Sequence, residues 1–331
     1  MAYRVELAFR RAAAPLLPRD ATVLAAVSGG CDSIALLDLL ARLAPSRNLS
    51  LTVAHLDHGL RRGSRSDRLF VERTARSRDL PCLSERVAVA DLRRRDESLE
   101  EAARRVRLAF LRRVARETDC TWIATGHNMD DQAETILMRL VRGAGATALT
   151  GIAARGPGPF VRPLLGLTRE ELSGYLERRG LEHREDPTNR DQRFDRNRVR
   201  LRVLPFLREH LNPQASRHLV KAAERLREDA VFLDEMALRR LGRVAEIDRA
   251  GRVSLEAAGL AGQPAPIAKR MAHLILQQAG VDPRRVTTRH VNSLLDLATG
   301  GSGRSLDLPG RLQASRVRQR LVLGARPDSE E

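Results

Sequence analysis

The stretch from Val23 to Ser33, VLAAVSGGCDS, decides the fold class. Its first half is a short apolar run, typical of a buried strand, and the apolar residues from Ser33 to Leu43 recur at helical spacing. The glycines between them allow the backbone to approach a ligand closely, and a helix N-terminus offers unpaired N–H groups and a positive dipole end. The segment therefore predicts a strand, an anion-binding loop and a helix, in that order.

The loop Ser28-Gly29-Gly30-Cys31-Asp32-Ser33 differs from the common nucleotide-binding loops. It contains neither GxxxxGK[ST] nor GxGxxG. The alternative, a tight glycine turn, would need neither the two hydroxyls nor an acid inside an anion site. Because Asp32 repels phosphate unless a cation lies between them, the sequence predicts a magnesium ion that bridges Asp32 and pyrophosphate oxygens.

Strand and helix signals alternate through the first half of the chain. Apolar runs at 51–54, 83–89 and 122–125 predict three further strands. Strands that alternate with helices of this length indicate an α/β fold, with a parallel sheet covered by helices on both faces. The intervening helices are expected at 64–78, 99–118 and 129–141, the second of them opened by a capping box.

Polar motifs follow the second and fourth predicted strands. His55 opens the segment HLDHGLR, which ends at Arg61, and His127 lies in TGHNMDDQAET. The carboxyl ends of parallel strands meet at the edge of the sheet where ligands bind. Asp131 and Glu134 share a helix face at this edge. Acids there are commonly dipole partners, but beside an anion-binding loop this pair also suits an ammonium group or a second metal ion.

Two arginine-rich segments are candidates for phosphate contacts, because arginine binds the phosphates of ATP or RNA bidentately. Arg104 and Arg107 lie on one face of a predicted helix, where a helix salt bridge is the alternative. Arg196, Asn197 and Arg198 belong to a charged segment without a clear period. For any single one of these residues, a solvated loop is an equally good explanation.

The second half of the chain has a different organisation. Pro205 and Pro213 interrupt the sequence, and the residues that follow have a long helical pattern to Leu241. Short apolar runs and two further helical stretches then predict a small second domain that is α+β or mainly helical. We place the catalytic domain at residues 1–214 and the second domain at 215–331.

Charge and cysteine content narrow the class of protein. The chain of 331 residues has a net charge of +16, carried almost entirely by arginine, which favours a polyanionic partner over a merely solvated basic surface. Cys31, Cys82 and Cys120 are far apart, which argues against disulfides and against a zinc or iron–sulfur site. Neither a signal peptide nor a membrane-spanning run is apparent, so we expect a cytoplasmic protein that does not bind membranes.

Taken together, these motifs resemble the tRNA(Ile)-lysidine synthetase family, in its short form, within the ATP-pyrophosphatase or PP-loop superfamily. SGGCDS, HLDHGLR, EEAARRVR, TGHNMDDQAET and the pair EDPTN and RNRVR occur in the family's order and spacing over about residues 20–210. The resemblance implies ATP and Mg²⁺ as cofactors, and an isoleucine tRNA with a CAU anticodon and free L-lysine as partners. It also implies a tRNA-binding, mainly helical C-terminal domain and is compatible with a homodimer.

The resemblance also assigns roles to residues. It places ATP at the loop of residues 28–33 together with His55 and His127, and Mg²⁺ at Asp32. Asp131 and Glu134 are expected to bind lysine and, with Asp32, to serve catalysis. Contacts with phosphate or tRNA are expected from Arg61, Arg104, Arg107, Arg196, Asn197 and Arg198.

The implied reaction is a two-step ligation. The wobble cytidine is adenylated with release of pyrophosphate, and the ε-amine of lysine then displaces AMP to give lysidine, which changes codon recognition from AUG to AUA. One rival is a cytidine thiolase, which the isolated cysteines disfavour. Two others are a small-molecule amidating enzyme such as an NAD or GMP synthetase, and a basic RNA-binding protein with a degenerate nucleotide site. The intact Asp32 and Ser33 argue against such degeneration.

Overall fold

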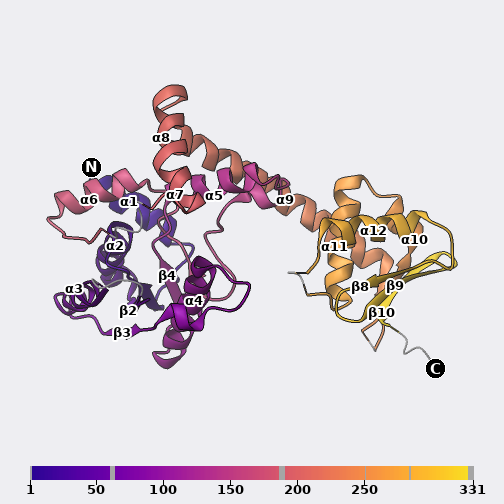
Figure 1. The fold of residues 1–331 in the computed structure, drawn as a ribbon, viewed down its shortest axis with the longest axis horizontal. Helices are drawn as coiled ribbons and strands as arrows, with labels where there is room; N and C mark the ends of the chain where they lie inside the picture. The colour runs from indigo at the N-terminus through magenta and orange to yellow at the C-terminus, as the bar shows by residue number, and fades with distance from the viewer. Residues whose placement is uncertain (1, 60–63, 186–190, 250, 283–284, 327–331) are drawn as a thin grey trace. The chain divides into compact units, whose positions relative to one another are not determined.

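The computed structural model describes residues 2–59, 64–185, 191–249, 251–282 and 285–326. The chain divides into two compact units, Met1–Glu224 and Arg225–Glu331 (Figure 1). The division falls within α9 (Ala215–Val244), which begins at the residue where the sequence analysis placed the second domain. Each unit has its own hydrophobic core, so each is described separately. Within the described residues, no helix has both the length and the apolar character needed to cross a bilayer.

Unit 1 is built on a five-stranded parallel sheet of order β3-β2-β1-β4-β5. The central strand β1 (Thr22–Ala26) pairs with β2 (Ser50–Asp57) on one side and with β4 (Trp122–Thr125) on the other. The edge strands are β3 (Cys82–Arg86) and β5 (Phe160–Val161). The four predicted strands are confirmed, whereas β5 was not predicted because two residues are too few to show a period.

Helices cover both faces of this sheet, as predicted. Successive residues of β1 point to opposite faces: Val23 and Ala25 pack in one core with α1, α2, α3 and α6, and Leu24 packs in another with α4. The α/β fold is thereby confirmed. The helices and 3₁₀ turns of this part are α1 (Ala2–Ala13), α2 (Cys31–Arg47), α3 (Ser64–Arg76), η1 (Val89–Leu92), α4 (Leu99–Glu117), α5 (Met129–Val141), η2 (Ala148–Thr150) and α6 (Arg169–Arg178).

A further helical segment runs from Asp195 to Leu211, and we call it the helical finger. Figure 1 shows its α8 region extending away from the parallel sheet of unit 1 before the chain enters α9. The sequence analysis found no period here, because π-helical turns are wider than the 3.6-residue turns of an α-helix. The finger consists of α7 (Asp195–Arg198), the π-helical turn η4 (Val199–Val203), α8 (Leu204–Phe206) and the π-helical turn η5 (Leu207–Leu211).

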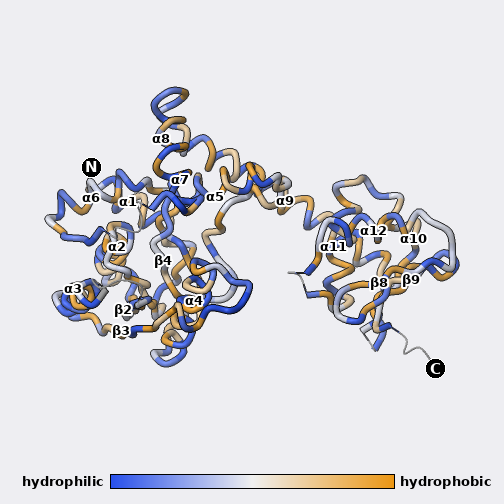
Figure 2. Tube along the Cα trace, in the orientation of Figure 1, coloured by the Kyte–Doolittle hydropathy of each residue, from blue (hydrophilic) through white to orange (hydrophobic). Residues whose placement is uncertain are grey.

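Unit 2 contains the expected helices, so the predicted, mainly helical second domain is confirmed, and it also carries a small antiparallel sheet of order β6-β7-β10-β9-β8. Short strands of alternating burial such as β7 (Val253–Glu256) cover the helices with one face. Hydrophobic and hydrophilic residues alternate along the helices, as one buried face requires (Figure 2). The other elements are β6 (Ala245–Ile247), α10 (Ala257–Ala261), α11 (Ala265–Gln278), α12 (Thr288–Thr299), β8 (Ser305–Leu308), β9 (Leu312–Val317) and β10 (Arg320–Ala325).

Candidate functional site

The hydroxyl of Ser33 shapes the loop that follows β1. The backbone N–H groups of Ser28 and Gly29 donate to Ser33 Oγ over 3.2 and 3.1 Å, and this hydroxyl donates to Gly30 O over 2.8 Å. Gly29 has a φ of 93°, a left-handed conformation that a side chain would strain. Gly30, the N-cap of α2, forms no side-chain cap, so the first N–H groups of this helix remain available to an anion. The loop is thus a preformed anion cradle in which Ser33 is a structural residue.

Asp32, in the first turn of α2, has one oxygen without a partner. Its Oδ2 accepts a hydrogen bond from Arg169 over 2.8 Å, while its Oδ1 is buried and unpaired among the described residues. Burial raises the pKa of Asp32, although Arg169 and the nearby Asn128 oppose the rise. An unpaired carboxylate oxygen beside an anion cradle fits Mg²⁺, which proteins bind through one or two carboxylates and the substrate phosphates.

Other buried polar atoms in this region also lack partners within the described part of the chain. Among them are Nδ2 of Asn128, Nε2 of His55 and Nε of Arg169. His55 Nδ1 lies 2.8 Å from Val27 O, which places its proton on Nδ1, and burial lowers the pKa of His55. Its Nε2 is therefore a free acceptor. An unpaired buried polar group costs about 1–3 kcal/mol, so a bound ligand would relieve a penalty at each of these atoms.

The loop after β4 lies directly against the start of α2. A Cβ at Gly126 would lie 3.2 Å from the carbonyl atoms of Asp32, so glycine permits this approach. His127 Nδ1 lies 2.9 Å from Thr125 Oγ1. Burial lowers the pKa of His127 to about 4, and the positive charge of nearby arginines acts in the same direction. His127 is therefore a neutral imidazole at pH 7.

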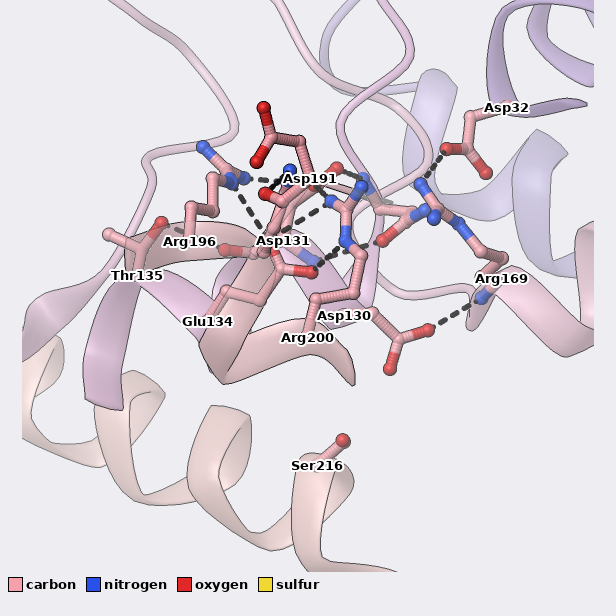
Figure 3. Close-up of polar contacts among 12 residues, drawn as sticks. Asp32, Asp130, Asp131, Glu134, Thr135, Arg169, Asp191, Arg196, Arg200 and Ser216 are labelled. Atoms are coloured by element: carbon pink, nitrogen blue, oxygen red, sulfur yellow. Dashed lines mark hydrogen bonds and ion pairs between the residues drawn. The ribbon is translucent and has the colours of Figure 1, made fainter. Parts of the chain in front are cut away.

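Asp131 and Glu134 form a buried carboxylate pair on the first turns of α5, and arginines occupy it (Figure 3). Asp131 Oδ1 accepts from Arg196 and Arg200 over 2.9 and 3.0 Å, and its Oδ2 accepts from the backbone of Asn128 over 3.0 Å. Glu134 accepts from Arg196 Nε over 2.7 Å and from Arg200 Nε over 2.6 Å, each on a different oxygen. All carboxylate oxygens of the pair are thus hydrogen-bonded.

This environment decides the charge state of Asp131. Burial alone would raise its pKa, but Arg196 and other positive neighbours outweigh burial and lower the pKa of Asp131. The carboxylate therefore stays ionised at neutral pH. The pair is a site built for cationic groups, and it holds guanidinium groups in this structure.

The neighbouring Asp130 connects α5 to two other segments. Its Oδ2 accepts from the backbone N–H of Arg169 over 2.8 Å, and its Oδ1 pairs with Arg208. Arg208 also donates to Ser216 Oγ over 2.7 Å. Asp130 thus fastens the start of α6 and the end of the helical finger beside the carboxylate pair.

Residues 2–207 match the family model of the PP-loop domain. The chain belongs to the PP-loop family. It is 39% identical over 309 residues to a tRNA(Ile)-lysidine synthase of Geobacter sulfurreducens, covering 92% of this chain and 65% of that protein. It is 42% identical over 317 residues to a protein of the same name from Thermus thermophilus, covering 96% of this chain and 59% of that protein. The chain thus spans less than two thirds of the length of these relatives.

A solved PP-loop structure has the same fold. It is the U34-tRNA thiolase NcsA from Methanococcus maripaludis with its [4Fe-4S] cluster. The match has a TM-score of 0.59 at 19% sequence identity and covers 68% of this chain and 78% of that one. At this identity the likeness concerns the architecture alone.

The PP-loop site gathers most of the residues that the sequence singled out. The anion cradle, Asp131, Glu134 and Arg196 lie at one end of the parallel sheet, with His55 and His127 beside them. Arg104 and Arg107 are exposed on α4. Arg107 acts on the pKa of His127, which places it at the rim of the site.

Other expected contacts point elsewhere or cannot be placed. The amide of Asn197 donates to Asp191 O over 2.8 Å, and Arg198 pairs with Asp195 on the exposed side of the finger. Both therefore hold the local chain in this structure. Arg61 lies outside the described residues.

The sequence analysis missed several arginines of the PP-loop site. Arg169 pairs with Asp32, and Arg200 shares the carboxylate pair with Arg196. A signal was present for Arg200, which stands four residues after Arg196 and thus on the same helix face. Arg162 directly follows β5 at the ligand-binding edge, and burial, aided by the charge of Arg104, lowers its pKa. Arg162 was missed because the short strand β5, which it follows, was not predicted from the sequence.

Proposed function

We propose that this chain is a tRNA(Ile)-lysidine synthase, a ligase that forms a carbon–nitrogen bond. It adenylates the wobble cytidine of a CAU-anticodon isoleucine tRNA and then joins free L-lysine to that base, which changes codon recognition from AUG to AUA. The observation that carries the proposal is the buried, unpaired Oδ1 of Asp32 beside the uncapped start of α2. Relatives of the stated name support the choice of substrates.

In the first step, the carbonyl oxygen at position 2 of cytidine attacks the α-phosphorus of ATP, and pyrophosphate leaves. The N–H groups at the start of α2 stabilise the charge of the leaving pyrophosphate. Mg²⁺, held by Asp32, would supply further charge neutralisation when bound. Arg169, which faces Asp32, is placed to contact the phosphate chain once its carboxylate partner binds the ion.

In the second step, the ε-amine of lysine attacks the activated carbon, and AMP leaves with the oxygen. Asp131 and Glu134 bind the lysine ammonium, which takes the place of an arginine at these carboxylates. The lowered pKa of Asp131 keeps it ionised for this purpose. Because an ammonium group cannot attack, one of the two carboxylates accepts its proton before the bond forms.

The chemistry of the cysteines argues against the rival thiolase. Burial, aided by the charge of Asp32, raises the pKa of Cys31 to about 12, and burial raises the pKa of Cys82 to about 11. Both remain thiols at neutral pH, whereas sulfur transfer needs a thiolate.

We propose further that unit 2 binds tRNA and that the protein acts in the cytoplasm, where its substrates are.

The test is a lysine-transfer assay with the full chain, ATP, Mg²⁺, radiolabelled lysine and an isoleucine tRNA transcript with a CAU anticodon. We expect label in this tRNA and none in a methionine tRNA transcript. Release of pyrophosphate without label transfer would leave adenylation standing and overturn lysine as the nucleophile. The absence of both products from folded protein would overturn the proposed function.

A further inference from the structure

The helical finger carries two stripes of side chains with opposite surroundings. Its π-helical turns are wider than α-helical turns, so residues four apart stay on one face along its whole length. The arginines of the inner stripe pair with acids of α5, and its leucine is buried. The outer stripe is exposed at each position. The inner stripe consists of Arg196, Arg200, Leu204 and Arg208, and the outer stripe consists of Arg198, Arg202, Phe206 and His210.

The inner stripe fixes the position of the finger. Arg196 and Arg200 pair with the carboxylates of Asp131 and Glu134, and Arg208 pairs with Asp130. These are charge-assisted bonds to buried or nearly buried acids, the strongest class of protein hydrogen bond. The outer stripe is therefore held in a defined position next to the catalytic carboxylates, as it would not be on a flexible loop.

The outer stripe combines positive charge with an exposed aromatic surface. The rings of Phe206 and His210 meet edge to face, with centroids 4.6 Å apart, and Phe206 is 55% exposed. Leu201 and Leu211 of the finger are exposed as well. Folding alone does not favour an exposed phenyl ring, and π-helical turns are rare and often occur at functional sites. These observations indicate a surface that binds a partner.

The chemistry of the finger favours RNA as that partner. It contains five arginines and two acidic residues, in a chain with a net charge of +16. Single-stranded nucleic acid is bound by aromatic side chains that stack on bases and by arginines that neutralise phosphates. An acidic protein partner would meet the arginines but would make no use of the Phe206–His210 pair as a stacking platform.

We propose that the outer stripe binds unpaired nucleotides of the tRNA beside the catalytic site. Phe206 and His210 stack on a base, and Arg202 contacts the adjoining phosphate. This inference rests on the proposed function, because it takes tRNA as the substrate. It adds the surface that holds the nucleotides next to the modified base.

The test measures the dissociation constant of the full chain for the CAU-anticodon isoleucine tRNA transcript over about 50–200 mM salt. Phe206→Ala is expected to weaken binding about tenfold without changing the salt dependence, because stacking is lost and charge is not. Phe206→Trp should bind as the wild type does. Arg202→Gln should lower the slope of log Kd against log salt by about one. Tyr3→Ala, which removes a 74% exposed aromatic from α1, is the matched control and should bind normally.

The outcomes distinguish the proposed stacking surface from the proposed function. If Phe206→Ala binds normally, or if Phe206→Ala and Tyr3→Ala weaken binding equally, the stacking surface is overturned. The proposed function still stands in that case, provided that the wild-type protein transfers lysine. If Phe206→Ala changes only the concentration dependence of sedimentation, the outer stripe is an interface between copies of the chain, and the inference is wrong. A wild-type protein that neither binds this tRNA nor transfers lysine overturns both.

Discussion

The two acidic groups at the edge of the parallel sheet are neutralised in opposite ways. Asp32 has one arginine partner and one buried oxygen with none among the described residues, and burial raises its pKa. In the pair of Asp131 and Glu134 every carboxylate oxygen is hydrogen-bonded, and arginines hold the pKa of Asp131 down against burial. A ligand completes the first group, whereas it must replace existing partners at the second.

The largest expected effect comes from disrupting the fully hydrogen-bonded pair of Asp131 and Glu134. Glu134→Ala removes the buried partner of Arg196 and Arg200 and should lower the free energy of unfolding by about 3–5 kcal/mol in urea titrations. Glu117→Ala breaks the exposed i,i+4 pair with Arg113 and should cost no more than about 1 kcal/mol. Similar losses in the two variants would show that the carboxylate pair does not stabilise the fold.

Asp32, which has an unpaired oxygen among the described residues, should behave in the opposite way: its replacement should affect activity and not stability. Asp32→Asn is expected to lower the rate of tRNA-dependent pyrophosphate release about 10²–10³-fold, because the proposed magnesium ligand is lost. Its melting temperature should not fall, since the raised pKa shows that the folded protein favours the neutral side chain. Glu170→Gln, an exposed acid next to Arg169, is the control and should keep its activity. A clear loss of stability in Asp32→Asn would contradict the proposed difference between Asp32 and the pair of Asp131 and Glu134.

A smaller effect tests how the two groups are joined. Gly126→Ala places a Cβ 3.2 Å from the backbone of Asp32 and should lower the free energy of unfolding by about 1–3 kcal/mol through overpacking. Gly166→Ala, where a Cβ meets nothing within 4 Å, is the matched control. Equal stability of the two variants in urea would show that the approach of the β4 loop to α2 is not tight.

The smallest effect is a pH dependence of opposite sign at the two aspartates. The pKa of Asp131 is lower in the folded protein, so its stabilisation is complete above the unfolded value of about 3.9 and is lost as pH falls through the folded value. The pKa of Asp32 is higher in the folded protein, so its penalty is relieved as pH falls. Urea titrations from neutral to acid pH should show the stability deficit of Asp131→Asn shrinking toward acid. A deficit that grows instead would reverse the assigned direction.

Local patterns were enough for the backbone elements that carry the acids, but not for the partners of either acidic group. The strand, loop and helix around Asp32 follow from neighbouring residues, and so do the four predicted strands. The partners of the acids come from distant segments: Arg169 is 137 residues from Asp32, and Arg200 is 66 residues from Glu134. No period or spacing records such pairings. The acidic pocket was therefore predicted, but not that arginines fill it.

The capping box at the start of α5 has a consequence for the flexibility of the carboxylate pair. Asp131 Oδ2 accepts from the backbone of Asn128, while the side chain of Asn128 accepts from the backbone of Asp131. The carboxylate is thus locked in one rotamer by its own helix, and only Oδ1 faces incoming cations. An exchange of arginine for another cation leaves this lock untouched. The protein therefore loses little side-chain entropy at Asp131 when its partner changes, because that entropy was already given up when α5 folded.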